Sequence, residues 1–282
     1  MQKRGMIACL AVVACACPVA RGSEEPAEPP SDEQLAAWVA DLRDDDIQWN
    51  AAQAEHLLLK AGVVAIRHLE GALSSDDYQQ RQFAAGVLRR QKEYEPSDLM
   101  LRVCVEGLAD DTLPMKRSDP GRDNGSYNNF YNASRGIEYL VPHVERAERF
   151  LIAAIIGPRD EQQRLLAAFV LGAGGRGGTA PLVAEVLIPH LRDNDLEEDA
   201  KYACYGLYHL GESVVPFLQA ALDGADAQQR ELLTLIIDDL LNPPDREQTF
   251  QNKQRQNITS VVCDPAVEEW YQGFYGFDPR RW

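Results

Sequence analysis

The chain has 282 residues, enough for one large domain or two small ones, and its 45% hydrophobic content is that of an ordinary folded protein. It carries 44 acidic against 28 basic residues, a formal net charge of −16. A surface this acidic repels nucleic-acid phosphates and anionic lipid headgroups, which argues against a nucleic-acid partner. Two interpretations of the charge remain open: solubility alone, or attraction for a partner such as a basic protein or a cation.

Residues 1–22 have the pattern of an export signal. Two basic residues precede an apolar run, residues 5–16, that is too short to span a bilayer as a helix. Two processing sites compete. Signal peptidase would cleave before Ser23, whereas residues 12–15 resemble a bacterial lipobox in which Cys15 is lipidated. We therefore expect an exported protein of the periplasm or cell envelope, whose only membrane contact is a lipid anchor on Cys15 if that site is used.

Residues 23–34 begin as an acidic, proline-rich linker, because their composition leaves little to pack into a core. Ser31 and Gln34 then have the spacing of a capping box, in which each side chain satisfies a backbone amide of the other. This spacing predicts that the first helix begins here. That helix carries Leu35 and Trp38 on its apolar side.

An internal repeat organises residues 35–242. Asp-x-Gln-Gln-Arg occurs at Asp77–Arg81, Asp160–Arg164 and Asp226–Arg230, and a degraded copy begins at Asp46. The intervals fit one period of about 33 residues, with about twenty residues inserted between the copies at Asp77 and Asp160. In each copy we predict that the aspartate caps a helix and that the arginine, one turn further on, interacts with that aspartate.

Each copy of the motif is followed by apolar residues at helical spacing. After the first copy they run from Ile47 to Ala61, Gly62 ends the helix, and a second apolar helix covers residues 66–73. No segment alternates with the period of a strand, so the predicted fold class is all-α. Cys104 and Cys204 lie on apolar faces, which predicts small buried side chains and no readable disulfide framework.

The repeated motif, followed by Ala-Ala-x-x-Leu as in residues 84–88 and by a Val-Val-Pro-x-Leu helix at residues 214–218, resembles the HEAT-repeat family in its short, phycobilisome-lyase-like form. The resemblance covers residues 35–241. It implies a right-handed α-solenoid of about six helix pairs, each covering the apolar stripe of its neighbours. Because packing defines this family, the resemblance implies binding of another macromolecule and no particular reaction.

Two segments outside the regular repeat contain the candidate partner-binding residues. The insertion, residues 110–129, is a loop by composition with a local excess of positive charge; it is either a binding loop or a tolerated surface insertion. The tail, residues 243–282, ends in aromatic side chains and is either a cap over the last helix pair or a docking segment. The candidates are Lys116, Arg117, Arg122, Trp270, Tyr271, Phe274, Arg280 and Arg281.

The glycine-rich segment 172–178 joins two predicted helices. A loop of this kind binds phosphate when a strand precedes it and a Lys-Ser/Thr pair follows. The sequence has neither, so we predict a flexible turn.

The sequence contains no pattern typical of an active site. Its 5 histidines lack metal-ligand spacing, no nucleophile elbow occurs, and the carboxylates gather in helix caps and turns. We therefore predict no catalytic residue, no metal and no cofactor, and expect a non-enzymatic protein–protein interaction scaffold. Two alternatives stay open. The family resemblance also implies a bilin-lyase-like or chaperone-type role, and lipidation of Cys15 would suit a structural tether.

Overall fold

Every regular element in the described part of the computed structural model is a helix. The structure describes residues 29–43, 50–109, 132–157, 160–192 and 199–242, and these contain no strand. The all-α fold class predicted from helical spacing is therefore confirmed. The α-helices are α1 (Asp32–Asp41), α2 (Ala52–Ala61), α3 (Ile66–Ala72), α4 (Tyr78–Arg89), α5 (Asp98–Glu106), α6 (Asn132–Leu140), α7 (Val144–Ile156), α8 (Glu161–Ala173), α9 (Ala180–His190), α10 (Asp199–His209), α11 (Val215–Ala221) and α12 (Ala227–Leu241).

Two kinds of local sequence set where these helices begin. Several begin at a serine or aspartate cap, and Ser31 forms the predicted capping box with Gln34 at the start of α1. Others follow the preceding helix through a short 3₁₀ turn, as α3 follows α2 and α11 follows α10. Gly62 and Gly211 open those two turns with φ of 65° and 66°, a left-handed conformation that favours glycine. The prediction that Gly62 ends its helix is confirmed.

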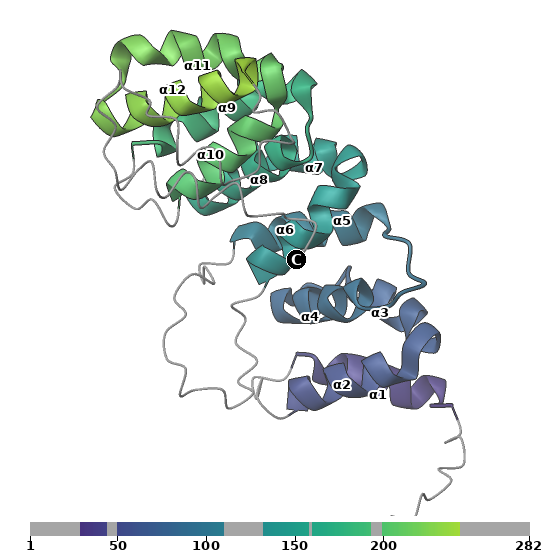
Figure 1. The fold of residues 1–282 in the computed structure, drawn as a ribbon. Helices are drawn as coiled ribbons and strands as arrows, with labels where there is room; N and C mark the ends of the chain where they lie inside the picture. The colour runs from purple at the N-terminus through teal and green to yellow at the C-terminus, as the bar shows by residue number, and fades with distance from the viewer. Residues whose placement is uncertain (1–28, 44–49, 110–131, 158–159, 193–198, 243–282) are drawn as a thin grey trace, which may run out of the picture.

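The helices form successive layers along the chain, with α1 beside α2, α3 beside α4 and so on to α11 beside α12 (Figure 1). The sequence repeat groups the same helices into pairs of a first helix and the second helix that follows it in the chain. The pairs are α2/α3, α4/α5, α6/α7, α8/α9 and α10/α11, with α1 before them and α12 after them. The first helix of each pair contacts the first helix of the next, from α2 to α4 and onward to α12. Among the second helices, α5 contacts α7 and α9 contacts α11. Segments that are close in the chain are therefore close in space.

One hydrophobic core runs through all the pairs, from Leu35 in α1 to Ile236 in α12. It consists mainly of leucine, alanine and valine side chains that face the neighbouring helices. A single pair has too little apolar surface to stay folded alone, so each stripe is stable only while the next pair covers it. Cys104 and Cys204 belong to this core and are free thiols, which confirms that both are buried small side chains.

A close helix approach lies at a glycine that the sequence assigned to a turn. Gly172 belongs to α8, and a Cβ atom added to it would lie 2.3 Å from the carbonyl oxygen of Gly206 in α10. Only hydrogen fits between these backbones, so α8 and α10 touch directly. The prediction of a flexible turn over residues 172–178 is therefore wrong at its start. The turn begins at Gly174, and a 3₁₀ turn at residues 177–179 leads into α9.

Candidate functional site

The structure describes the repeat-motif residues singled out from the sequence but none of the residues predicted to bind a partner. The described motif residues are the aspartate and arginine of each intact copy: Asp77, Arg81, Asp160, Arg164, Asp226 and Arg230. The candidate lipidation site and all the candidate partner-binding residues lie outside the described residues; these are Cys15, Lys116, Arg117, Arg122, Trp270, Tyr271, Phe274, Arg280 and Arg281.

The aspartate of each motif caps the helix that follows it, as predicted. Its carboxylate accepts a hydrogen bond from the backbone amide three residues on, at 2.7 Å for Asp77, 2.7 Å for Asp160 and 2.8 Å for Asp226. This contact satisfies an amide that the helix leaves unpaired, and the negative charge suits the positive end of the helix. The aspartates are therefore helix caps.

The arginines have partners that the sequence did not predict. Arg81 donates to both carboxylate oxygens of Glu106 in α5, and Arg164 donates to Glu161 at 3.3 Å. In the described residues none of these arginines donates to the aspartate of its own motif. The hydrogen bond with Glu106 raises the pKa of the Arg81 guanidinium, and the charge of Asp77 contributes to this increase.

Each arginine also donates to a backbone carbonyl that precedes its helix. Arg81 donates to the carbonyl of Ser75 at 2.8 Å, and Arg230 donates to the carbonyl of Ala225 at 2.7 Å. Arg164 contacts the carbonyl oxygen of residue 155 at 3.2 Å in the same way. The arginine thus fixes the turn that leads into its own helix.

The two glutamines of the motif cap a helix that lies earlier in the chain and is separated from their own helix by one helix pair. Gln80 donates to the carbonyl of Val39 at 2.6 Å and Gln79 to that of Leu42 at 3.0 Å, both at the C-terminal end of α1. The last carbonyls of a helix have no partner within it, so the glutamines satisfy them. The other two motifs repeat this contact: Gln162 with Leu108, Gln163 with Val105, Gln228 with Leu191 and Gln229 with Ile188, at 2.8–3.1 Å.

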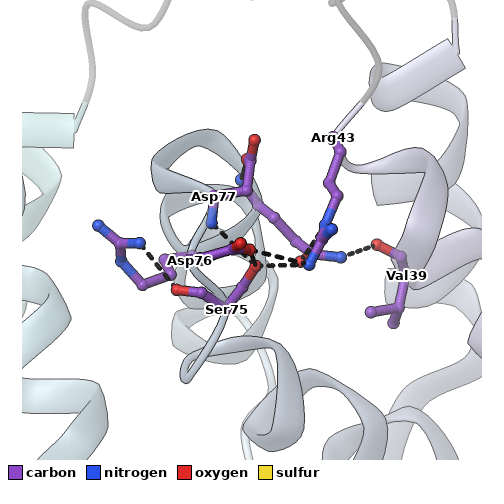
Figure 2. A network of polar contacts seen from close by, with 7 residues as sticks. Val39, Arg43, Ser75, Asp76 and Asp77 are labelled. Atoms are coloured by element: carbon purple, nitrogen blue, oxygen red, sulfur yellow. Dashed lines mark hydrogen bonds and ion pairs between the residues drawn. The ribbon is translucent and has the colours of Figure 1, made fainter.

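Figure 2 shows the first of these networks, in which Val39 and Arg43 of one segment face Ser75, Asp76 and Asp77 of another. Arg43 donates to the Gln80 side-chain oxygen at 2.7 Å and to the Ser75 hydroxyl at 2.8 Å. At the far end of the chain Arg192 donates to Gln229 at 2.7 Å in the same way. These networks hold helices together, so the repeat motif is structural and contributes no exposed site.

A shallow, open hollow lies over α7, beside the N-terminal end of α5, and measures about 490 Å³. It is lined by Asp98, Glu145, Arg146, Glu148, Arg149 and Ile152, and Ile156 follows Ile152 by one helical turn. We call these seven residues the α7 face. The Ile156 side chain is 71% exposed, the highest value among the exposed large hydrophobic residues of the described chain.

Most charged groups of the α7 face have partners within the protein. Arg149 forms an ion pair with Asp98, and its guanidinium lies 4.6 Å from the centre of the Phe150 ring. Arg146 donates to the backbone carbonyl of residue 96 at 2.6 Å, and Glu148 forms an ion pair with residue 176. Among the described residues, Glu145 alone of this set has no such partner. Its carboxylate is exposed to solvent.

An ion pair lies inside the helix stack, between Glu55 and Arg90. Glu55 of α2 is 7% exposed and forms an ion pair with Arg90, which follows α4. Burial raises the pKa of the Glu55 carboxyl group, although the charges of Arg90, Arg135 and Arg89 oppose this change. The pair joins two consecutive first helices. A buried pair of this kind is costly to break, because either group left alone is a charge without a partner.

His190, at the C-terminal end of α9, lies between two carboxylates. Its Nδ1 atom is 3.5 Å from Asp199 at the start of α10, and its Nε2 atom is 3.4 Å from Glu161 at the start of α8. The hydrogen bond with Asp199 and the nearby negative charges raise the pKa of the imidazole, against an opposing effect of burial. Protonated His190 therefore links three helices electrostatically.

None of these groups forms a centre for covalent or metal chemistry. Burial raises the pKa of both described thiols, Cys104 and Cys204, so neither is a ready nucleophile. Within the residues that the structure describes, no three histidine, cysteine, aspartate or glutamate side chains are placed to hold a metal ion. The same residues include no helix that is long and apolar enough to cross a membrane.

Sequence reasoning missed the α7 face for an identifiable reason. In the structure, Val144, Ala147 and Leu151 form the packed stripe of α7, and all three are buried. Ile152 and Ile156 lie on the next face around the helix, where a helix that packs on one side carries polar residues. An apolar pair outside the packed stripe was the signal in the sequence.

No protein-family model matches the chain, and no curated protein matches it. The geometry of the described residues is therefore the basis for the proposals below.

Proposed function

We propose that this protein is a HEAT-like, right-handed α-solenoid that acts as a non-enzymatic scaffold for protein–protein contacts. Three observations support the proposal. Helix pairs follow one another along the chain, first helices contact first helices, and one core runs through the pairs. Proteins built from such stacked pairs offer long continuous surfaces to their partners.

The exposed apolar surface of the α7 face is the observation that best supports a binding function. Ile156 is 71% exposed beside a hollow whose other walls are charged. An apolar residue surrounded by polar and charged groups is the composition of a protein interface, in which an apolar centre is enclosed by a polar rim. An isolated exposed isoleucine needs no explanation, but here Ile152 continues the apolar surface into the hollow.

We further propose that the scaffold works in the bacterial cell envelope after export. The signal-like residues 1–22 and the acidic, proline-rich segment after them support this location. Two variants test the route. Replacing Cys15 by alanine abolishes radiolabelled palmitate incorporation if the lipobox is used. Incorporation that persists in this variant, or that never occurs in the wild type, contradicts lipidation at Cys15, and cleavage before Ser23 then remains.

The binding function is tested by affinity capture from gently solubilised envelopes with the wild-type chain and the Ile156→Asp variant. The control is Val63→Asp, because Val63 is 53% exposed in the turn between α2 and α3, away from the α7 face. We expect a stoichiometric partner with the wild type and the control, and its loss with Ile156→Asp. A partner that all three proteins retain equally would show that the α7 face is not the binding site.

A further inference from the structure

We propose that the α7 face binds a protein segment that presents a large aliphatic side chain and, about two helical turns away, a lysine or arginine. This inference rests on the proposed scaffold function and names the chemistry of its partner. Two independent properties of the face support it: where its apolar surface lies, and which of its charges is still available.

The apolar part of the face fixes the position of the aliphatic contact. Ile152 lines the hollow and Ile156 lies one turn further along α7, so their side chains form one continuous strip. Ile156 is at the last residue of the helix, and its side chain is 71% exposed. A partner side chain that covers this strip must be apolar, since a polar group placed there would lose water without gaining a hydrogen bond.

The charged part of the face selects a cation. Both guanidinium groups of the lining are already engaged, Arg149 with Asp98 and Arg146 with a backbone carbonyl. Glu145 remains available, and it lies on the same side of α7 as Ile152, seven residues or about 10 Å away along the axis. An acidic segment would meet the Glu145 carboxylate and the field of a chain with net charge −16. A basic residue instead forms an ion pair with Glu145.

The same charges disfavour a second copy of this chain as the occupant. A symmetric contact between two α7 faces brings like surfaces together, because residues on each side of a two-fold axis meet the same patch. Two Glu145 carboxylates and two strongly acidic chains would then repel each other. A basic partner gains from the same field, and its association rate falls as salt is added.

The proposal is tested by selecting peptides from a random display library on the full chain. Selections run in parallel on the wild type, Glu145→Lys and Ile156→Asp, with Glu212→Lys and Val63→Asp as controls. Glu212 is an exposed glutamate in the turn before α11, and Val63 is an exposed valine in another turn. Because all four substituted positions are at the surface, circular dichroism should show the same helix content in every variant.

We expect wild-type peptides that combine an aliphatic residue with lysine or arginine. They should bind Ile156→Asp at least about tenfold more weakly and the two controls unchanged. Selection on Glu145→Lys should exchange the basic residue for aspartate or glutamate. Peptides that need Ile156 but show no preference for basic residues would overturn the inferred partner chemistry and leave the scaffold standing. Peptides that ignore Ile156, or a selection without binders, would overturn binding at the α7 face itself.

Discussion

Replacing Gln80 by leucine tests whether the repeat motif works as a cap across helix pairs. Gln80 is 5% exposed and donates to the carbonyl of Val39 at 2.6 Å, while its side-chain oxygen accepts from Arg43 at 2.7 Å. Leucine fills a similar volume but leaves that carbonyl unpaired, which costs about 1–3 kcal/mol. Arg43 keeps its hydrogen bond to Ser75, so losing its bond to Gln80 adds little to the destabilisation. We expect a net destabilisation of about 2 kcal/mol.

The measurement combines urea unfolding with hydrogen exchange. Stability in stacked helix pairs is partly local, and α1 lies at one end of the described stack, so its amides should lose protection before the rest of the chain. The control is Gln219→Leu, because Gln219 is exposed on α11 and its change should stay within about 0.5 kcal/mol. Equal stability of the two variants, with unchanged protection in α1, would refute the capping role of Gln80.

Three further changes test other contacts of the stack. Arg90→Ala leaves the buried Glu55 carboxylate unpaired and should cost about 3 kcal/mol at neutral pH in urea unfolding; because burial raises the pKa of Glu55, the loss should shrink as acid protonates it. The raised pKa of His190 stabilises the fold fully below its unfolded value of about 6.5, and this contribution is lost as pH rises through the folded value. Thermal unfolding of His190→Gln across this range should lack that loss, and an unchanged pH profile would contradict the link. Gly172→Ala should cost about 1–3 kcal/mol by overpacking, whereas Gly178→Ala, with nothing within 4 Å, should be neutral by the same thermal assay.

The fold class and the helix starts followed from sequence because they depend on local chemistry. An aspartate or serine before an apolar stripe needs only the next few amides to act as a cap, and Asp77 and Ser31 do so as predicted. Gly62 likewise ends its helix through its own backbone conformation. Gly172 was misassigned because its role depends on the approach of Gly206, a residue in another helix. No local pattern specifies such an approach.

The candidate site was harder to predict because it depends on what stays uncovered. The sequence shows that α7 has a packed stripe but not which other face a neighbour covers. Ile152 and Ile156 could have packed against a further helix, and only the arrangement of α5 and α7 shows that Ile156 remains exposed. The availability of Glu145 follows in the same way from the partners that Arg146 and Arg149 find elsewhere.

The glutamine contacts indicate that the structural unit is two helix pairs and not one. The motif occurs at the start of α4, α8 and α12, which are alternate first helices, and its glutamines cap α1, α5 and the end of α9, each one pair further back. Each of those capped helices precedes a connection that the described residues do not include, at 44–49, 110–131 and 193–198. A first helix that follows such a connection has no intact copy of the motif, since α2 has only the degraded copy at Asp46, and the next first helix carries an intact one. The glutamine contacts therefore hold together the helices on the two sides of each such connection, with one folded helix pair lying between them. The same glutamine contacts recur across the insertion at 110–129 as across the shorter connections, which is expected because loop length adds little to the free energy of closing a chain whose ends are held by other contacts.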